Sequence, residues 1–425
     1  MLTLYRIAAF IIYYGILPYT YISYLFGSKK WGDRLGYHKS EGNHQAGRKT
    51  IWLHASSMGE VKVLSILVQQ LTALDRDLEY YITVMTETGL KSAQSISASK
   101  ITVGFMPIDY QMPIRRFISQ VNPAAAIFIE TEIWPNMIIS LGKQKIPVFL
   151  ANGRLSEKAS SRYRLAKSGL AKVLSNYARV MVQSEQDKTR YLSIGADPNR
   201  IEVIGSLKFD APMTEVPPEK KKSLRKSFPF PQGTRLFTAG STRESENRMI
   251  LEIYKNLSAD FPQIRLVLVP RHLDHLEEVC HIAAELDLSC TLYSKIDRNA
   301  EQVKVVVVDQ MGILNDIYAI SDIAFVGGTL VDIGGHNILE PVWAGIPVLY
   351  GPSIFNVTDS SEYIREHKFG EMVADEGVLL EKLRLFFRGE ITYIQKSAAS
   401  GENSRAYRTA RIILNYLSGE WKKSG

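Results

Sequence analysis

The sequence predicts an α/β protein in which two domains, each with its own parallel sheet, follow an apolar N-terminal helix. Three observations lead to this prediction. Strand-like runs rich in Val, Ile and Phe alternate with helical patterns through most of the chain. A proline-rich, basic segment interrupts the alternation near its middle, and a run of twenty uncharged residues precedes it.

The N-terminal element is the uncharged run from Ile7 to Phe26, IAAFIIYYGILPYTYISYLF. At about 1.5 Å per residue it is long enough to cross a bilayer core of roughly 30 Å, so residues 1–30 are expected to form a retained membrane anchor. Four basic residues follow it within 29–39 and only Arg6 precedes it, which places the rest of the chain in the cytoplasm. The alternative is a tyrosine-rich helix that lies in the membrane interface, broken at Pro18.

The next element is a series of βα units. Strand candidates are IWLH at 51, YITVMT at 81, AAAIFIE at 124 and PVFLA at 147, each followed by a helical pattern. Short, fully apolar strands that alternate with helices are typical of a parallel sheet covered on both faces. Residues 31–210 are therefore expected to form a Rossmann-like domain.

A connection and a second Rossmann-like domain follow. Residues 211–233, APMTEVPPEKKKSLRKSFPFPQG, combine five prolines with a basic run and are expected to be a linker. Strand candidates resume with RLFTAG at 235, RLVLVP at 265, KVVVVD at 304, DIAFVGG at 322 and PVLYG at 347. The second domain is assigned to 234–425, and its last helical pattern, near 404–421, is expected to pack back on the first domain.

Composition narrows the function only slightly. The excess of 51 basic over 44 acidic residues fits anionic lipid, a phosphorylated substrate or nucleic acid without choosing between them. Two cysteines in 425 residues exclude a disulfide scaffold and fit a reducing compartment. The sequence contains no Cys-x-x-Cys or His-x-x-x-His pair with zinc spacing and no P-loop signature, so no metal site is expected.

In doubly wound sheets, ligands bind beyond the carboxyl ends of the strands, so residues that follow strands are the first candidates for chemistry. Glu60 follows the strand IWLH in ASSMGE and begins a helical pattern. A carboxylate near a helix N-terminus is kept ionised and able to accept a proton. Ser57 and Glu60 also have the spacing of a capping box, in which the glutamate only caps its own helix, and the spacing favours neither function.

Two further candidates lie at strand ends of the first domain. Glu130 and Glu132, in ETEIWPN, stand at the junction where the strand AAAIFIE passes into a loop, and two acids there are poor choices for packing. A pair of acids at the start of a helix is the alternative, and it suits Glu132 better than Glu130. Lys208, in GSLKFD, follows the strand IEVIG and stands just before the linker, where an ammonium could reach an interdomain cleft or simply face solvent.

In the second domain, Arg271 directly follows the strand RLVLVP, and its planar guanidinium could grip a phosphate. The run VGGTLVDIGGHNILEP is rich in glycine, and Asn337 is expected to open a helix whose N–H groups favour an anion; a plain glycine-rich turn is the alternative. Glu340 could accept hydrogen bonds from ribose hydroxyls. Met311 and Gly312 form a small loop after another strand, either a platform for a base or phosphate or a helix start.

Eight segments in a fixed order resemble the Kdo (3-deoxy-D-manno-octulosonic acid) transferase family of lipopolysaccharide biosynthesis: HASSMGE, ETEIWPN, NGRLS, GSLKFD, VPRH, FVGGTL, GGHNILEP and YGPSIFN. The resemblance covers nearly the whole chain. It implies a GT-B fold, with two Rossmann-like domains across a cleft, and a metal-independent, inverting transfer from CMP-β-Kdo to a lipid A precursor, tetraacyldisaccharide 1,4'-bisphosphate. It implies no cofactor and no nucleic acid, and a location on the cytoplasmic face of a bacterial inner membrane, in contact with its lipid.

The resemblance also implies roles for single residues. The first domain binds the acceptor, with Glu60 as general base and Glu130 and Lys208 as stabilisers of the transition state. The residues that match the CMP site in the second domain are Pro270, Arg271, Met311, Gly312, Ile313, Asn337, Ile338, Leu339 and Glu340. The sequence departs from the family where Arg243 stands in place of a common histidine, and at Ile313 and Asn315.

Six basic residues and one acid between Arg154 and Lys172 could meet the acceptor phosphates, or form a solvated helix face. Two other functions compete with Kdo transfer. Another GT-B enzyme that uses a UDP-sugar would bind uridine instead of cytidine nucleotide. A membrane-tethered nucleotide-binding scaffold would show no turnover and no effect of losing Glu60.

Overall fold

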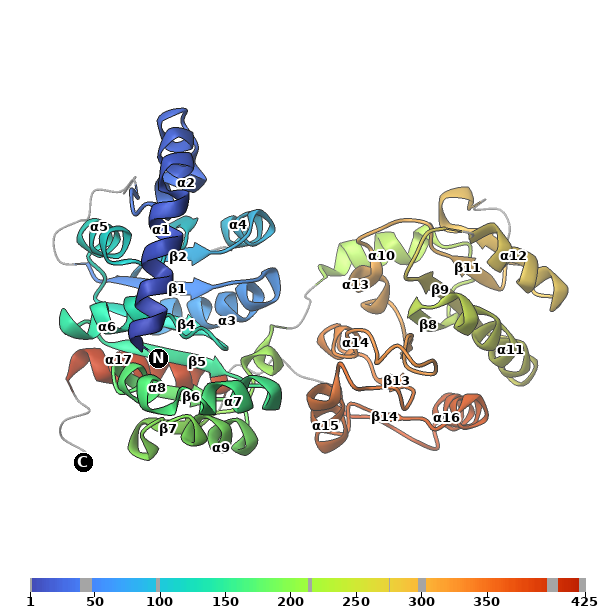
Figure 1. Ribbon diagram of the computed structural model, residues 1–425. Helices are drawn as coiled ribbons and strands as arrows, with labels where there is room; N and C mark the ends of the chain where they lie inside the picture. The colour runs from blue at the N-terminus through green and yellow to red at the C-terminus, as the bar shows by residue number, and fades with distance from the viewer. Residues whose placement is uncertain are drawn as a thin grey trace. The chain divides into compact units, whose positions relative to one another are not determined.

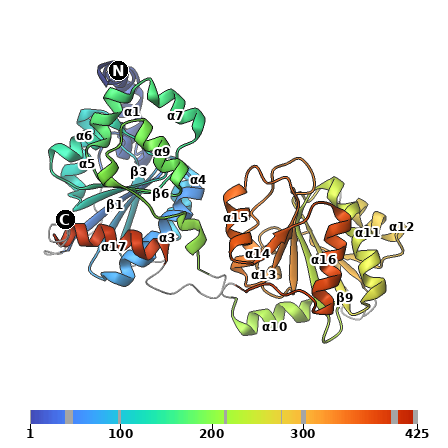
Figure 2. The same cartoon turned by 90° about the horizontal axis from the view of Figure 1, so that it is seen from below.

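The computed structural model describes residues 2–38, 48–96, 100–212, 216–274, 276–296, 303–395 and 404–419. Lys39, one of the basic residues expected to flank the anchor, lies outside these ranges, as do 420–421 of the last helical pattern. The chain divides into two compact units, which Figures 1 and 2 show from two sides. Unit 1 is Met1–Ala211 with Ser400–Gly425, and unit 2 is Pro212–Ala399.

Unit 1 is a parallel sheet covered by helices on both faces. Its strands are β1 (Thr50–Ala55), β2 (Glu79–Val84), β3 (Ile101–Phe105), β4 (Ala125–Ile129), β5 (Val148–Gly153), β6 (Tyr177–Val182) and β7 (Ile201–Val203). Its helices are α1 (Leu2–Leu25), α2 (Lys29–Arg34), α3 (Met58–Leu74), α4 (Glu87–Gln94), α5 (Gln111–Val121), α6 (Pro135–Lys143), α7 (Glu157–Arg164), α8 (Lys167–Leu174), α9 (Glu185–Ser193) and α17 (Arg405–Ser418), with the short 3-10 turns η1 (Pro198–Arg200) and η2 (Leu207–Asp210).

The strand order in unit 1 is β3-β2-β1-β4-β5-β6-β7, all parallel. Alternate residues of each strand enter one of two cores: Leu53 packs with α3 and α17, whereas Trp52 packs with α5 and α6. Because both faces are covered, the central strands are mostly apolar, which is the pattern that predicted a parallel sheet. The order of strands reverses between β1 and β4, so their carboxyl ends form the topological switch point where such sheets bind ligands.

Unit 2 repeats this architecture. Its strands are β8 (Arg235–Thr242), β9 (Ile264–Pro270), β10 (Cys290–Leu292), β11 (Val305–Val307), β12 (Ile323–Val326), β13 (Val348–Tyr350) and β14 (Gly370–Met372), in the order β10-β11-β9-β8-β12-β13-β14. Its helices are α10 (Pro218–Ser227), α11 (Glu244–Asp260), α12 (Leu276–Glu285), α13 (Leu314–Tyr318), α14 (Glu340–Trp343), α15 (Thr358–Glu366) and α16 (Glu376–Arg388), with the 3-10 turn η3 (Tyr293–Lys295). Here the order reverses between β8 and β12, which defines a second switch point. The predicted class, two Rossmann-like α/β halves, is confirmed.

The segment 211–233, expected to be a linker, contains α10, which belongs to unit 2. Pro218 suits the first helical position because its fixed φ is helical and its missing N–H has no helical partner there. Phe228, just after the helix, is 4% exposed and packs in the core of unit 2. The basic run therefore forms the polar face of a docked helix.

Unit 1 also contains both ends of the chain. Helix α17 packs on α3 and on η2, and its residues Ala406, Ala410 and Ile413 are fully buried in the unit 1 core. Their spacing of three and four residues places them on one helix face. At the other end, α1 is the one helix in the described part of the chain that is long and apolar enough to cross a membrane.

Candidate active site

The switch point of unit 1 collects the acids predicted from the sequence. β1 ends at Ala55 and leads through Ser56 and Ser57 into α3, which begins at Met58. β4 ends at Ile129, and Glu130 and Glu132 follow it. Since β1 and β4 are paired in parallel, both loops leave the same edge of the sheet. Neither acid lies in the first turn of α6, which begins at Pro135, so the helix-start alternative does not apply.

The Glu60 carboxylate is held by the loop that precedes its own helix. Its Oε2 accepts a hydrogen bond from the backbone N–H of Ser56 at 2.8 Å, and its Oε1 accepts one from the Ser57 hydroxyl at 3.0 Å. The Ser57 hydroxyl in turn accepts from the Glu60 N–H at 3.3 Å, so Ser57 caps α3, whereas the Glu60 carboxylate binds the N–H of Ser56 and not that of Ser57 and the capping box is incomplete. Burial and then the charges of Glu132 and Glu130 raise the pKa of Glu60, which makes it a better proton acceptor than an ordinary glutamate.

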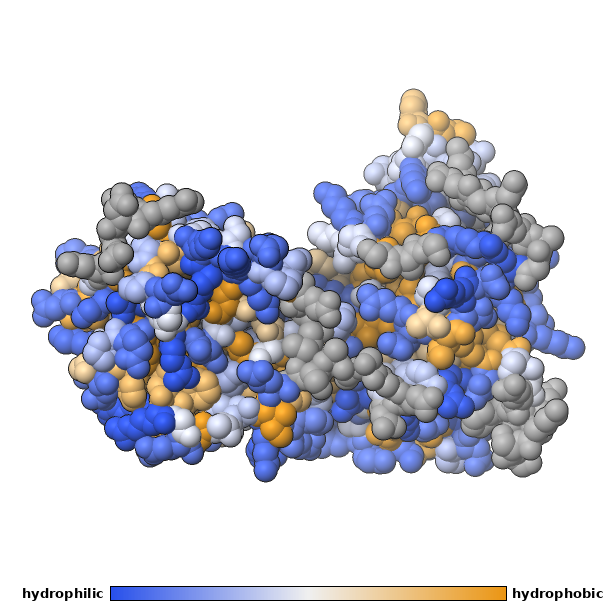
Figure 3. Space-filling view, turned by 180° about the vertical axis from the view of Figure 1, so that it is seen from behind, coloured by the Kyte–Doolittle hydropathy of each residue, from blue (hydrophilic) through white to orange (hydrophobic). Residues whose placement is uncertain are grey.

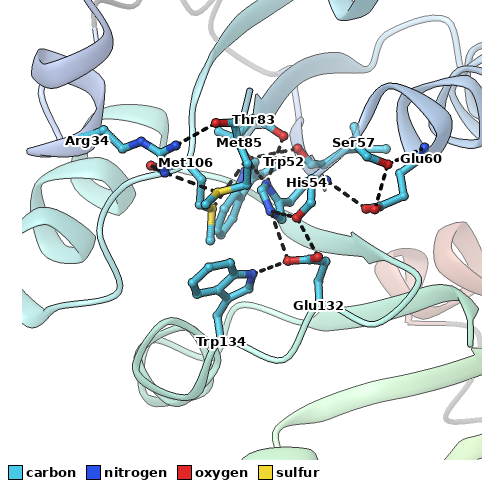
Figure 4. A network of polar contacts seen from close by, with 12 residues as sticks. Arg34, Trp52, His54, Ser57, Glu60, Thr83, Met85, Met106, Glu132 and Trp134 are labelled. Carbon is cyan, nitrogen blue, oxygen red and sulfur yellow. Dashed lines mark hydrogen bonds and ion pairs between the residues drawn. The ribbon is translucent and has the colours of Figure 1, made fainter. Parts of the chain in front are cut away.

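Glu132 is the centre of a network that the sequence did not predict (Figure 4). Its carboxylate accepts from the Ser56 hydroxyl at 2.6 Å and from the Trp134 indole N–H at 2.5 Å, and lies 3.4 Å from Nε2 of His54. Burial alone would raise the pKa of Glu132, but the contacts with His54, Ser56 and Trp134 lower it overall. Glu132 is thus a fixed anion, and Ser56 links it to Glu60.

His54 is buried at the end of β1. Its Nδ1 lies 3.0 Å from the Thr83 carbonyl oxygen and 2.9 Å from the Thr83 hydroxyl, and the Trp52 indole N–H donates to that same hydroxyl at 2.9 Å. An Nε2–H faces the Glu132 carboxylate while Nδ1 meets the Thr83 hydroxyl, so the ring orientation is set by β2 on one side and by Glu132 on the other. The histidine that begins the motif HASSMGE was the signal available in the sequence, but only the pairing of β1 with β2 and with β4 reveals its partners.

Asn152, at the end of β5, links Glu130 to the backbone of the residue before Lys208. Asn152 donates from its amide to Glu130 Oε1 at 3.4 Å, and its Oδ1 accepts from the Leu207 N–H at 2.9 Å. Burial raises the pKa of Glu130, opposed by the charges of Arg154 and Lys208. Glu130 and Asn152 both have left-handed backbone conformations, with φ of 62° and 56°, which β-carbons disfavour. The local fold thus keeps Glu130 and Lys208 near each other against a conformational cost.

The switch point of unit 2 is a glycine loop built around Glu246, another residue that the sequence did not single out. The Glu246 carboxylate is fully buried and accepts from the backbone N–H groups of Arg243, Gly328, Thr329 and Leu330 at 2.6–3.2 Å. A β-carbon on Gly327 would lie 2.4 Å from Thr242 Cα, so only glycine fits between the ends of β8 and β12. This carboxylate fixes the loop that follows β12 against the start of α11.

Beside this loop lies a cluster of cationic and imidazole side chains. The Arg243 guanidinium donates from Nε to His336 Nε2 at 3.2 Å, and its Nη1 lies 2.7 Å from His272 Nε2. Burial, followed by the charges of Arg243, Arg271 and His272, lowers the pKa of His336 to about 4, so His336 is a neutral acceptor near neutral pH. Arg271 follows β9, and its backbone N–H donates to the Thr242 carbonyl. In the described ranges no carboxylate pairs with either arginine, which leaves their charge for an anion.

The remaining predicted residues are distributed around the same edge of unit 2. Pro270 is buried at the end of β9, Met311 is 68% exposed, Gly312 has a φ of 86° in the turn before α13, and Ile313 packs partly into the core. Ile338 and Leu339 are buried, so only their backbone groups are available to a ligand. The amide of Asn337 donates to Glu340 Oε1 at 3.2 Å.

The prediction that Asn337 opens a helix is wrong. Asn337 Oδ1 accepts from the Leu339 N–H at 3.3 Å and forms a turn, and α14 begins only at Glu340 and has four residues. An asparagine side chain that bonds its own backbone two residues on competes with helix formation. Within the described residues, no group of three or more His, Cys, Asp or Glu side chains is arranged to hold a metal ion.

Comparisons with known proteins decide the family. The sequence model of the family described as 3-deoxy-D-manno-octulosonic-acid transferase (kdotransferase) matches residues 29–211. The 3-deoxy-D-manno-octulosonic acid transferase of Haemophilus influenzae is 34% identical over 306 residues, which cover 72% of this chain and 71% of that protein. The chain belongs to the Kdo transferase family. The sequence resemblance on which the residue roles were transferred is thereby confirmed.

Two further proteins are similar to this chain, one in sequence and one in fold. A bifunctional glycosyltransferase/methyltransferase of Fusobacterium nucleatum is 36% identical over 375 residues, which are 87% of this chain but only 57% of that protein. The crystal structure of UDP-GlcNAc 2-epimerase from Neisseria meningitidis has a TM-score of 0.55 at 15% identity, covering 87% of this chain and all of that one. At this identity the likeness shows the fold alone, the two-sheet GT-B architecture.

Proposed function

We propose that this family member is an inverting glycosyltransferase that moves Kdo from CMP-β-Kdo to the lipid A precursor tetraacyldisaccharide 1,4'-bisphosphate. Membership of the Kdo transferase family establishes the sugar transfer; the donor form, the acceptor and the residue roles are the proposal. The observation that carries the assignment is the Glu60 carboxylate, fixed at the carboxyl end of β1 by Ser56 and Ser57 with a raised pKa.

In the proposed reaction, Glu60 takes the proton of an acceptor hydroxyl while the oxygen of that hydroxyl forms a bond to the anomeric carbon of Kdo. The bond from that carbon to the phosphate oxygen breaks in the same displacement, and CMP leaves with the electron pair. A single displacement inverts the anomeric configuration. A base is needed because a neutral hydroxyl is a poor nucleophile.

The departing CMP gains negative charge. In the proposal, the cationic side chains of unit 2 stabilise this charge. Arg271 and Arg243 lie on loops after β9 and β8, and the neutral His336 orients the Arg243 guanidinium through its Nε. Charge-assisted hydrogen bonds from guanidinium groups to phosphate are among the strongest in proteins. Glu340 and the backbone of 337–340 are assigned to the ribose, and the turn at Met311 and Gly312 to the base.

The acceptor side of the proposal rests on unit 1. Glu130 and Lys208, whose charges interact, are assigned to stabilise the charge that develops at the reacting centre. The exposed cations between Arg154 and Lys172, on the β5–α7 loop, α7 and α8, are assigned to the acceptor phosphates. Because the acceptor is a lipid, the proposal places the protein on the cytoplasmic face of the inner membrane, attached through α1.

The test is the mass of the lipid product. Full-length protein is incubated with the tetraacyl precursor and with CMP-Kdo generated in situ, and lipids are analysed by mass spectrometry. The precursor is expected to gain the mass of one or more Kdo residues, and no product should form when a UDP-sugar replaces CMP-Kdo. A lipid of unchanged mass with CMP-Kdo, or a glycosylated product from the UDP-sugar, contradicts the proposal.

A further inference from the structure

Helix α1 has a protein-facing side that runs along its entire length. Thr20 is fully buried and Tyr13 is 3% exposed. The half-buried positions are 2, 5, 9, 16, 17, 23 and 24. Together these positions recur every three or four residues, which is the spacing of a single helix face. Helix α1 therefore turns one face toward unit 1; Figure 1 shows its first part in front of the sheet and its last part beside α2.

The first half of α1 is held by a specific polar contact. The Tyr5 hydroxyl donates to Asp109 Oδ2 at 2.6 Å. Asp109 is 6% exposed and also accepts from the backbone N–H groups of Asn136 and Met137, at the start of α6. Leu2, one turn earlier, packs against the core of unit 1. The N-terminal end of α1 is thus attached to the folded unit.

The centre and the second half of α1 are held by aromatic stacking. The Tyr13 ring stacks on Tyr110, at the start of α5, with centroids 4.5 Å apart. The Tyr24 ring stacks on Tyr37, which follows α2, at 4.9 Å. Each stacked pair is worth about 0.5–1.5 kcal/mol beyond the area that it buries. Contacts with unit 1 therefore occur at the beginning, the middle and the end of the helix.

The outward side of α1 is apolar throughout, and Arg6 is the one charged residue between Leu2 and Leu25. The large apolar side chains that are at least 46% exposed are Leu4, Ile7, Phe10, Ile11, Ile12, Tyr14, Tyr19, Tyr21, Ile22 and Leu25, with Phe26 just after the helix. The space-filling view in Figure 3 shows that the end of unit 1 where α1 meets α2 is also apolar. A continuous apolar strip of this length on a protein surface requires a nonpolar partner.

Cations flank this strip at both ends. Leu165, between α7 and α8, is 85% exposed, and the neighbouring Arg162, Arg164 and Lys167 are exposed as well. This turn lies near the start of α1, because Gly169 of α8 is next to Leu2. At the other end, Lys29 is exposed directly after α1. Basic side chains around an apolar strip match the anionic headgroups that surround the acyl chains of a bilayer.

We infer that α1 lies parallel to the membrane surface, with its outward face among the acyl chains, and does not cross the bilayer. This inference rests on the membrane attachment proposed above and fixes its geometry. If α1 stood upright across the bilayer, the segments packed along its whole length, including the buried carboxylate of Asp109, would be drawn into the hydrocarbon with it. Burying such polar groups in hydrocarbon costs several kcal/mol each. An in-plane helix keeps unit 1 in water and only its own apolar side in lipid.

The orientation can be measured with nitroxide labels on full-length protein in which Cys280 and Cys290 are replaced by serine. Single cysteines are introduced at the outward positions Leu4, Ile11 and Ile22, and at Thr88 on α4 as a water-exposed control. The protein is bound to vesicles of phosphatidylethanolamine and phosphatidylglycerol. Collision with oxygen and with a water-soluble nickel chelate then gives the depth of each label.

An in-plane helix predicts similar, shallow depths at the three outward positions, about 5–10 Å below the phosphates, and a fully aqueous label at Thr88. A helix that spans the bilayer separates Leu4 from Ile22 by about 27 Å along the membrane normal, because eighteen residues rise about 1.5 Å each. That profile, deepest at Ile11 and shallow at opposite surfaces for the other two, overturns the inference. Protein that does not float with the vesicles at all overturns the membrane attachment itself, so the two failures are distinguishable.

Discussion

Glu60→Gln separates the two functions that the position of Glu60 allows. Glutamine retains the size of the side chain, and its carbonyl oxygen can still accept from the Ser56 N–H, which is the 2.8 Å contact in the structure. The change replaces a charge-assisted hydrogen bond, worth about 1.5–3 kcal/mol, by a neutral one worth about 0.5–1.5 kcal/mol. The raised pKa of Glu60 means that its surroundings disfavour the charged form, which offsets this loss, so the stability should change by no more than about 1 kcal/mol, or about 2–4 °C in Tm.

The expected loss of activity is much larger. An amide cannot accept the proton of the acceptor hydroxyl, and general-base assistance is worth roughly 100- to 10,000-fold. Transfer by the Glu60→Gln enzyme should therefore fall by at least about 100-fold, which corresponds to about 3 kcal/mol in the activation free energy. CMP affinity, measured by calorimetry, should stay near that of the parent, because the nucleotide is assigned to unit 2.

The pH dependence provides a second measurement of the same group. Because burial and the charges of Glu132 and Glu130 raise the pKa of Glu60, transfer should decline on the acid side with a midpoint above that of an ordinary glutamate. The base is competent above this pKa and lost as the pH falls through it. The residual transfer activity of Glu60→Gln should not show this decline at low pH.

Ser57→Ala is the matched control for the capping role. It removes the Ser57 hydroxyl, which accepts from the Glu60 N–H and donates to Glu60 Oε1, and leaves the charged carboxylate bound by the Ser56 N–H. Loss of an N-cap hydroxyl costs about 0.5–2 kcal/mol of stability, so Ser57→Ala should be destabilised at least as much as Glu60→Gln and yet remain active. A well-folded Glu60→Gln enzyme that transfers Kdo at nearly the parental rate would refute the assignment and make Glu130 the next candidate.

Four further predictions follow from other parts of the structure. Arg271→Ala and Glu340→Ala should each weaken CMP binding without changing the melting curve, and unchanged calorimetric affinity in both would remove them from the donor site. Deleting the first 27 residues should move protein from the membrane fraction to the soluble fraction; a truncated protein that sediments as completely as the full chain places the anchor elsewhere. Gly327→Ala should destabilise unit 2 by about 1–3 kcal/mol or more, because the added carbon would lie 2.4 Å from Thr242 Cα, and denaturant unfolding with an unchanged midpoint would contradict this packing. Glu132→Gln should shift the low-pH decline of the transfer rate to lower pH, because the charge of Glu132 raises the pKa of Glu60. A decline at the parental pH would show that Glu132 acts through its hydrogen bonds and not through its charge.

The fold was predictable because parallel sheets impose a strong pattern. Strands such as β1 and β12 are buried on both faces and read as short apolar runs between helical stretches, so the two Rossmann-like halves could be expected from the sequence. The segment 211–233 was harder, because the apolar side of α10 is supplied mainly by residues at its ends, such as Phe228, and the helix itself contains no buried residue. Asn337 misled because its side chain competes with the backbone for hydrogen bonds.

The site was predictable only in part, and the reason is the distance along the chain between partners. Glu60, Glu130 and Glu132 could be found because each lies within a few residues of the end of a strand. His54 and Glu246 could not, because their partners Glu132 and Gly328 lie about 80 residues away and meet them only when β1 pairs with β4 and β8 with β12. A buried, hydrogen-bonded residue inside an apolar run gives no sequence pattern that separates a packing role from a positioning role.

Three residues at strand ends near the two switch points, Glu130, Asn152 and Ser241, have positive φ between 56° and 62°. Glycine would adopt these conformations with about 1 kcal/mol less strain per position. Natural proteins are seldom at their stability optimum, and strained positions at functional sites are where thermal robustness and turnover diverge. Laboratory evolution for heat resistance alone should therefore accumulate glycine at these positions, whereas evolution that also demands sugar transfer should keep Glu130. Comparing the two pools would report which of the strained side chains the chemistry needs.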